Sequence, residues 1–128
     1  MRITILTSLC IALWLASTAG PSAAAMESRP VRFAKGASET TLTGTLKGDQ
    51  VIDYKLRAQA GQTLAVSLKT GNPGNYFNVL PPKSKDVAIF VGSTGGNDWS
   101  GALPTSGEYT VRVYLMRNAA RRNESANF

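Results

Sequence analysis

Histidine is absent from the 128-residue sequence, and the single cysteine, Cys10, lies near the N-terminus. Enzymes that work near neutral pH usually rely on histidine, or on a pair of carboxyl groups with shifted pKa values, as general acid and base. The 8 acidic residues show no spacing that would place two of them in one cleft. Phosphate-binding loops, nucleophile elbows and metal-binding motifs are also missing. We therefore expect a protein with no enzymatic activity, no metal site and no cofactor.

Residues 1–25 have the composition of a secretory signal peptide. A basic N-terminus is followed by an apolar run at 3–16 and then by small residues, including the alanines at 23–25. The run is too short to span a bilayer comfortably, and the alanines suit cleavage by signal peptidase at residue 25. We expect residues 26–128 to be exported as one mature domain without stable membrane insertion. Cys10 would leave with the signal, so that domain would contain no disulfide bond.

The mature chain carries an excess of positive charge. Arg2 is the one charged residue of the signal, so 13 lysines and arginines remain against 8 acidic residues, a net charge of +5. Such a surplus favours anionic partners. An exported protein rarely meets nucleic acid, so anionic envelope polymers or an acidic cleft on another protein are better candidates than nucleic acid. A basic surface that only keeps the protein soluble explains the same charge.

Short runs with a period of two, separated by Gly, Asn, Pro and Asp, are typical of an antiparallel β-sandwich or barrel. In one of these runs Leu64, Val66 and Leu68 should face the core while the intervening residues face water. At 103 residues the mature chain has room for one core, so we expect a single all-β domain. Strands are predicted at residues 31–34, 41–46, 51–58, 63–69, 76–80, 87–91 and 109–116.

Local composition also predicts how some of these strands are arranged. The strands at 41–46 and 51–58 flank the turn-forming residues 47–49, which favours a hairpin. The run 87–91 is apolar throughout, as in a strand covered on both faces, so we expect it in the middle of a sheet. Residues 92–101 are rich in small polar residues and glycine, so we expect a long loop there with its tryptophan packed in the core.

Two segments near the C-terminus could form a polar recognition surface. The turn at Ser106 precedes a strand and projects a hydroxyl group, and residues 117–124 break the alternation, as in a loop or one helical turn. The second segment contains Arg117, Arg121 and Arg122. A guanidinium group grips a carboxylate with two parallel hydrogen bonds, which lysine cannot do. We expect the serine turn to lie close to the arginines and to bind an anionic group with them; an ordinary strand entry beside a solvated loop is the alternative.

The most informative motifs are LPTSGEYTVRV at residues 103–113 and MRNAARRN at 116–123. On these motifs the sequence resembles the periplasmic inhibitors of goose-type lysozyme. The Ser-Gly-x-Tyr turn also occurs in inhibitors of other lysozyme classes. Weaker similarities follow the same order along most of the mature chain, at residues 32–36, 44–48, 54 and 60–62.

The resemblance implies a compact β-sandwich, similar to bacterial pre-peptidase C-terminal domains, that inserts a loop into the active-site cleft of a goose-type lysozyme. Such an inhibitor would act in the periplasm and help a bacterium to evade host defence. The arginines would pair with acids in or beside the cleft. A final strand after the equivalent of Phe128 is also implied, so we expect either a truncated chain or a sandwich with an open edge. The contact residues implied in this way are Ser106, Gly107, Tyr109, Arg117, Asn118, Arg121 and Arg122.

Two other functions fit the sequence. Tyr76, Trp99 and Tyr114 could stack on sugar rings in an exported module that binds peptidoglycan or another glycan, although packing in the core explains the same aromatics. The positive charge alone could hold DNA or a membrane surface nonspecifically, and such binding would collapse with modest salt. Sedimentation with insoluble peptidoglycan would separate a glycan-binding module from an inhibitor that need not bind the polymer.

Overall fold

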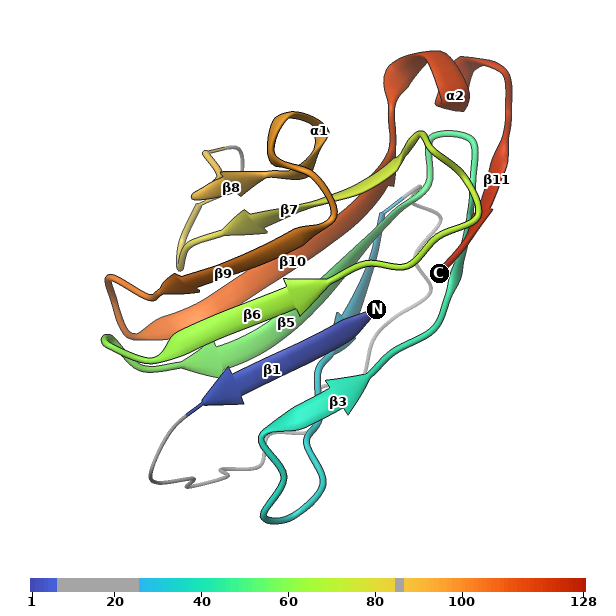
Figure 1. The fold of residues 1–128 in the computed structure, drawn as a ribbon. Coiled ribbons are helices and arrows are strands. Elements are labelled where there is room, and N and C mark those ends of the chain that lie inside the picture. Colours follow the sequence, from blue (N-terminus) through green and yellow to red (C-terminus); the bar gives the residue numbers. More distant parts are fainter. Residues whose placement is uncertain (7–25, 85–86) are drawn as a thin grey trace.

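Alternating apolar and polar residues build two β-sheets that pack face to face (Figure 1). The computed structural model describes residues 1–6, 26–84 and 87–128. Its strands confirm the all-β fold class predicted from the sequence. The predicted cleavage site at residues 23–25 lies outside the described residues, so signal cleavage stays a prediction. No helix in the described part of the chain is long and apolar enough to cross a membrane.

The larger sheet is centred on β10 (Gly107–Leu115), the longest strand, which lies antiparallel between β5 (Val51–Ala58) and β7 (Asn75–Leu80). At one edge β8 (Phe90–Val91) pairs with β7, and at the other edge β2 (Met26–Pro30) runs parallel to β5. Alternation along β10 follows the prediction, because every second side chain is fully buried. These buried residues are Tyr109, Val111 and Val113.

The smaller sheet has the strand order β3-β1-β6-β9 and is antiparallel throughout. Its strands are β1 (Arg2–Leu6), β3 (Glu39–Thr41), β6 (Thr63–Ser67) and β9 (Asp98–Ala102). The predicted inward face of β6 is confirmed, since one leucine and one valine of the strand are buried, as is the leucine that follows it. These side chains are Leu64, Val66 and Leu68.

Short elements complete the fold at one end of the sandwich. β4 (Thr45–Lys47) pairs with β11 (Ser125–Asn127), and α2 (Arg117–Arg121) joins β10 to β11. The sequence predicted either a loop or one helical turn for this segment, and the structure forms the helical turn. A second short helix, α1 (Gly92–Gly95), lies between β8 and β9.

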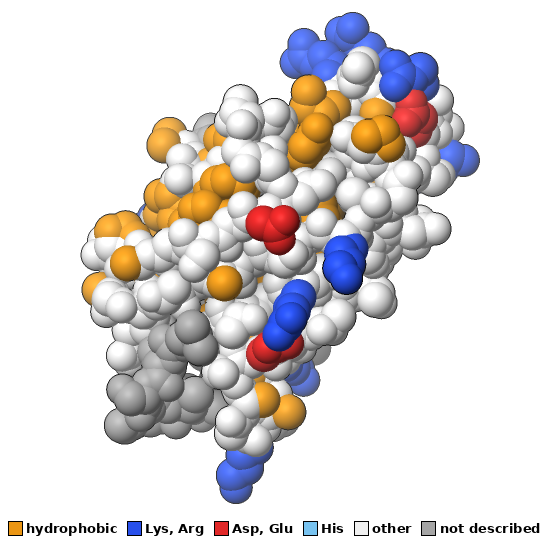
Figure 2. Space-filling view, in the orientation of Figure 1, with side chains coloured by type: hydrophobic (Ala, Val, Ile, Leu, Met, Phe, Trp, Pro, Cys, Tyr) orange, Lys and Arg blue, Asp and Glu red, His pale blue; other side chains and the backbone are white. Residues whose placement is uncertain are grey.

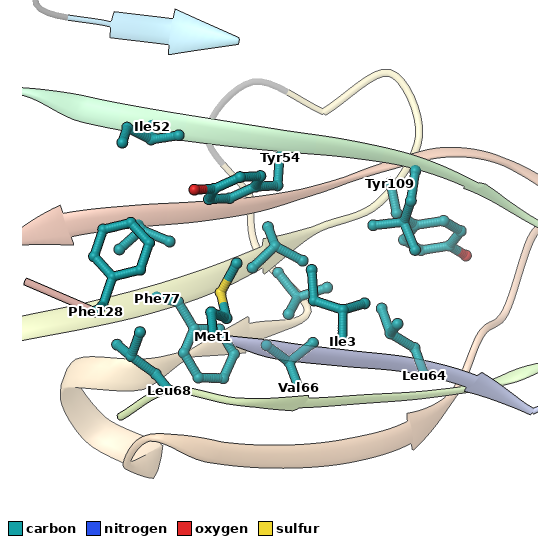
Figure 3. Close-up of a cluster of buried hydrophobic side chains, with 14 of the residues drawn as sticks. Met1, Ile3, Ile52, Tyr54, Leu64, Val66, Leu68, Phe77, Tyr109 and Phe128 are labelled. Atoms are coloured by element: carbon teal, nitrogen blue, oxygen red, sulfur yellow. The ribbon is translucent and has the colours of Figure 1, made fainter. Parts of the chain in front are cut away.

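The core lies between the two sheets (Figure 3). In the close-up, Ile3 and Val66 of the smaller sheet face Tyr54 and Tyr109 of the larger one. Phe128 closes one end of the core by meeting the ring of Tyr54 edge to face, with ring centroids 6.4 Å apart. All five side chains are at least nine-tenths buried, so they contribute most of the hydrophobic stabilisation available to them.

Three aromatic rings form a cluster that joins the two sheets. Phe90 lies between Phe77 and Trp99, with centroid distances of 5.2 Å and 5.7 Å respectively. Because Trp99 belongs to the smaller sheet and the phenylalanines to the larger one, this stack joins the two layers. Trp99, which was predicted to be packed in the core, is partly buried and packs against the core from its edge.

The predicted hairpin between residues 41–46 and 51–58 is wrong. β4 pairs with β11, and β5 pairs with β2 and β10, so the chain passes from one sheet to another at Lys47–Gln50. Hairpin rules consider only neighbouring segments, whereas here burial of β5 against distant β10 decides the pairing. The strand predicted at 31–34 is also wrong, since the strand of this region ends at Pro30.

Two expectations for residues 87–101 are wrong as well. The apolar run 87–91 is not a central strand, because only its last two residues form β8 at the sheet edge and the Val87 side chain is 75% exposed. Residues 92–101 are not one long loop, since they form α1 and most of β9. Apolar composition does not reveal which neighbours a strand has, so the edge position of β8 was missed. The many glycines and serines of the next segment are typical of loops, so the pairing of β9 with β6 was missed as well.

Candidate functional site

Basic side chains gather at the end of the sandwich that carries α2 (Figures 1 and 2). Three arginines and one asparagine are exposed on this helix and immediately after it, and we call these four residues the α2 surface. They are Arg117, Asn118, Arg121 and Arg122. These are four of the residues that the sequence predicted as lysozyme contacts, and the structure does bring them together on one short helical turn.

The helix is held against the body of the protein by the loop at residues 70–74. The Met116 amide donates a hydrogen bond to the carbonyl oxygen of Gly74 at 2.8 Å. Ala119 is 1% exposed and packs so closely that a Cβ on Gly74 would lie 3.0 Å from its own Cβ. The arginines therefore project from a backbone whose opposite face is buried.

Asn72 fixes the residues that follow the helix. Its side-chain nitrogen donates to Glu124 Oε1 at 3.1 Å and to the Ser125 carbonyl at 3.0 Å, while its oxygen accepts from the Gly74 amide at 2.8 Å. The side chain is nearly buried, so these bonds are shielded from competing water. Sequence reasoning interpreted Asn72 and its neighbours only as a loop before a strand, and no local signal predicts this distant partner.

The turn at residues 47–50 supports the same segment from another side. The Gly48 amide donates to the carbonyl oxygen of Glu124 at 2.9 Å, and a Cβ on Gly48 would lie 2.7 Å from Asn123 Oδ1. Glycine also suits the φ angle of +63° at this position. Two separate turns thus hold the α2 surface in place, although both lie far from it in sequence.

The arginines of the α2 surface differ in whether an acidic side chain lies beside them. Arg122 Nε lies 2.5 Å from Glu124 Oε2. This hydrogen bond, followed by the one from Asn72, holds the pKa of the Glu124 carboxyl below its usual range. Within the described residues Arg117 and Arg121 have no acidic partner, so their guanidinium groups offer unused hydrogen-bond donors.

The Ser106 turn is built from polar groups that satisfy one another. Ser106 Oγ accepts a hydrogen bond from the Ala60 amide at 2.9 Å, and the Tyr109 hydroxyl donates to the Thr105 carbonyl at 2.6 Å. The Tyr109 side chain is fully buried. Gly107 has a φ angle of +148°, and a Cβ there would lie 2.8 Å from Pro82 Cγ. The turn is therefore fixed by its own contacts. Of the three predicted contact residues in this turn, Ser106 alone has an exposed side chain.

The expectation that the Ser106 turn lies close to the arginines is wrong. The turn precedes β10 and α2 follows it, so the two segments occupy opposite ends of this strand (Figure 1). Nine residues of extended chain span about 30 Å. The two groups of predicted residues therefore form two separate regions of the surface, and we consider each by itself.

The three aromatic residues predicted as a sugar-binding platform do not all lie together, because Trp99 belongs to the smaller sheet and the two tyrosines to the larger one. Trp99 stacks on Phe90 at the edge between the sheets. Tyr76 and Tyr114 are cross-strand partners in the larger sheet, where the Tyr114 hydroxyl donates to Asn78 Oδ1 at 3.0 Å. The part of the chain that the structure describes also contains no group of three or more acidic, histidine or cysteine residues that could hold a metal ion.

Comparison with known proteins connects this architecture to one group of inhibitors. No protein-family model matches the sequence. The inhibitor of g-type lysozyme from Escherichia coli (strain K12) is 31% identical over 117 residues, which cover 91% of this chain and 87% of that protein.

Two solved structures extend this similarity to the fold. Aeromonas hydrophila PliG, a periplasmic inhibitor of g-type lysozyme, is 41% identical with a TM-score of 0.74, over 80% of this chain and 90% of that one. A mutant of the Escherichia coli PliG is 28% identical with a TM-score of 0.60, over 81% of this chain and 95% of the other. Sequence identity, coverage and fold agree with the resemblance seen in the motifs. The chain therefore belongs to the family of g-type lysozyme inhibitors.

Proposed function

We propose that this protein is a periplasmic inhibitor of goose-type lysozyme and that the α2 surface is the part that enters or covers the enzyme's cleft. The observation that carries this proposal is the state of Arg117 and Arg121. Both are exposed, both lack an acidic partner among the described residues, and both project from a helix whose Ala119 is buried. Exposed donors on a fixed backbone are suited to recognition of an anion.

A lysozyme cleft supplies groups that such a surface can bind. Glycoside hydrolases of this kind use carboxyl groups placed along a groove shaped for polysaccharide. A guanidinium group that pairs with one of these carboxyls would neutralise it, while the helix blocks the groove to substrate. Inhibition by this route requires no catalytic group on the inhibitor, in agreement with the lack of histidine in the sequence.

Rigidity should make this contact specific. The two supporting turns at residues 47–50 and 70–74 fix the backbone of the helix before the partner arrives, so less conformational entropy is lost on binding. Arg122 is partly neutralised by Glu124, so we assign the larger share of the binding energy to Arg117 and Arg121. Asn118 adds an exposed amide group between them.

The contact role implied for Ser106, Gly107 and Tyr109 stays a prediction. Because these residues lie at the other end of β10, they would need a second contact region, separate from the α2 surface. The Tyr109 ring is buried and glycine has no side chain, so Ser106 alone of the three could reach a partner with its side chain.

A bacterial-cell lysis assay tests the proposal. Protein purified from the periplasm of an expression host should inhibit a goose-type lysozyme at about nanomolar to micromolar concentration. A hen-type lysozyme serves as the specificity control, and sedimentation with peptidoglycan alone excludes protection of the polymer by coating. A folded protein that leaves goose-type lysozyme fully active would contradict the proposal.

A further inference from the structure

A methionine lies just before α2, and neither the helix nor the core explains it. Met116 is the N-cap residue of α2. Serine, threonine, aspartate and asparagine stabilise this position, because their side chains accept hydrogen bonds from the amides of the first turn, whereas a thioether cannot do so effectively. The Met116 side chain is 37% exposed, so the core does not bury it. A side chain that breaks a local preference without a gain in packing is typical of a functional surface.

The Met116 side chain lies on the outer face of the larger sheet. Leu115 is buried in the core, and the extended backbone of Met116, with φ −54° and ψ 150°, directs the next side chain to the opposite face. Tyr114 shares this outer face, and its hydroxyl donates to Asn78 Oδ1 at 3.0 Å, which holds the ring in place. We call Met116 and the half-buried Tyr114 the apolar flank.

The backbone of Met116 is held on both of its polar groups. Its amide donates to the Gly74 carbonyl, and its carbonyl accepts a hydrogen bond from the Ala120 amide, each at 2.8 Å. The neighbour across the strand is thus a glycine, which has no side chain that could cover the methionine. Met116 therefore presents an apolar side chain to solvent from a fixed position.

The apolar flank borders the α2 surface directly, because β10 leads into α2 (Figure 1). Arg117 follows Met116 in the chain, and Arg121 lies one helical turn later on the same side of α2. Ala119 is buried, so this helix faces the body of the protein with another side. Arginine and apolar side chains are therefore neighbours on one surface.

The composition of this combined surface is that of the centre of an interface. Tyrosine, methionine and arginine are enriched in protein–protein interfaces, and a methionine side chain adapts its shape to an irregular apolar wall. Grooves that bind a ligand are lined mostly by apolar and aromatic side chains, with a few polar groups among them. An apolar side chain beside guanidinium groups complements such a groove better than guanidinium groups alone.

We propose that Met116 is an apolar contact residue of the inhibitor, which packs against the wall of the lysozyme groove beside the carboxyl groups that Arg117 and Arg121 bind. Tyr114 supports it from the side of the sheet. This inference rests on the proposed function and adds to it the residue that meets the apolar part of the groove. Binding then depends on a charged contact, which salt screens, and on an apolar contact, which salt does not screen.

Isothermal titration calorimetry of the periplasmic protein with goose-type lysozyme tests the apolar contact. Met116→Ala should weaken binding about tenfold, because apolar area is no longer buried in the complex. Met116→Gln, of similar length but polar, should weaken it to a similar extent. Met116→Leu should retain the affinity within about threefold, since apolar character and volume are kept.

Ile89→Ala is the matched control. The Ile89 side chain is 39% exposed, nearly the same fraction as for Met116, and its amide donates to the Val79 carbonyl. Val79 lies five residues from Gly74 along an extended segment, a distance of about 17 Å. Loss of an exposed aliphatic side chain at this distance from α2 should leave the affinity for lysozyme unchanged.

Salt shows whether Met116 contacts the enzyme or only positions the arginines. The ratio of the dissociation constants of Met116→Ala and the wild type should be equal at about 0.1 M and about 0.5 M sodium chloride, while the wild-type affinity itself falls as the arginine contacts are screened. A ratio that approaches one at high salt would show that Met116 acts only through the arginines, and would overturn the proposal.

Other results would also overturn the apolar contact while leaving the proposed function intact. They are an unchanged affinity of Met116→Ala, an equal loss in Met116→Leu, and an equal loss in Ile89→Ala. Should Met116→Ala fail to fold, the contrast between Met116→Gln and Met116→Leu decides the same question. A folded wild-type protein that does not bind goose-type lysozyme would contradict the proposed function itself, and the apolar contact with it.

Discussion

At the N-terminal end of β10 the polar groups of the turn bind one another, whereas at its C-terminal end Arg117 and Arg121 have no acidic partner among the described residues. Ser106 and Tyr109 hold the backbone at the first end through bonds to Ala60 and Thr105. At the second end Arg117 and Arg121 project from a buried anchor. Both segments are rich in hydrogen-bonding groups, yet only one leaves most of them available.

This difference separates residues that build the inhibitor from residues that can contact its target. Hydrogen-bond donors already satisfied within the protein gain little by binding a partner, because one bond must be exchanged for another. Exposed guanidinium groups gain a charge-assisted bond when a carboxylate replaces water in a dry interface. The contrast leads us to expect effects on affinity at one end and effects on stability at the other.

The largest effect is expected for Arg117→Ala/Arg121→Ala. Loss of both unpaired guanidinium groups should weaken binding to goose-type lysozyme by about 2 to 5 kcal/mol, because partner carboxylates would be left buried without a counter-charge. Isothermal titration calorimetry gives this change. Arg57→Ala is the matched control, since Arg57 is exposed and pairs in register with Glu108 at the other end of β10. An equal loss of affinity in both variants would remove the distinction between the ends.

Gly107→Ala should reduce stability at the opposite end without weakening affinity of the folded protein. Alanine would be strained at a φ angle of +148°, and its Cβ would lie 2.8 Å from Pro82 Cγ. We expect a decrease of about 3 kcal/mol in the free energy of unfolding, measured with urea. Gly71→Ala is the control, because nothing lies within 4 Å of the added carbon. A similar small effect at both glycines would show that the turn is not rigid.

Tyr109→Phe should cost about 1 kcal/mol of stability, because the hydroxyl bond to the Thr105 carbonyl is lost while the ring stays in the core. The inhibition constant should not change. Thermal unfolding and the lysis assay give the two values, and Tyr76→Phe, at a half-buried tyrosine on the outer face, provides the comparison. A large loss of inhibition with unchanged stability would place the Tyr109 hydroxyl in the interface.

The smallest effect concerns Glu124. Because its pKa is lowered in the folded protein, the associated stabilisation exists above the pKa of the unfolded chain and disappears as the pH falls through the folded pKa. Carbon-detected NMR titration should show the Glu124 carboxyl titrating below a normal glutamate, and closer to normal in Arg122→Ala. An unshifted Glu124 pKa in the wild type would mean that Arg122 is as available to a partner as Arg121. The arginines of the α2 surface would then no longer differ in their acidic neighbours.

Period-two patterns predicted the parts of the fold that depend on local burial. The alternation of β10 and the inward face of β6 could be recognised from neighbouring residues. The break in alternation after β10 predicted a loop or one helical turn, and the structure forms the helical turn. The family motifs identified the correct group of proteins for the same reason, since they lie in contiguous segments. Hydrogen-bonding partners far apart in sequence leave no such local pattern.

Errors arose where distant contacts decide the structure. β5 carries the alternation of a hairpin strand, but its neighbours are β2 and β10, and the apolar run before Gly92 lies at an edge. The relative position of the Ser106 turn and the arginines was also misjudged, although a nine-residue strand between them necessarily separates their positions. The supports from Asn72 and Gly48 could be seen only in three dimensions.

Hydrogen exchange of the periplasmic protein, alone and in complex with goose-type lysozyme, tests most directly which end of β10 meets the enzyme. The account predicts slower exchange of backbone amides at residues 117–124 in the complex and unchanged exchange at residues 104–108. Protection of residues 104–108, with none at 117–124, would contradict it.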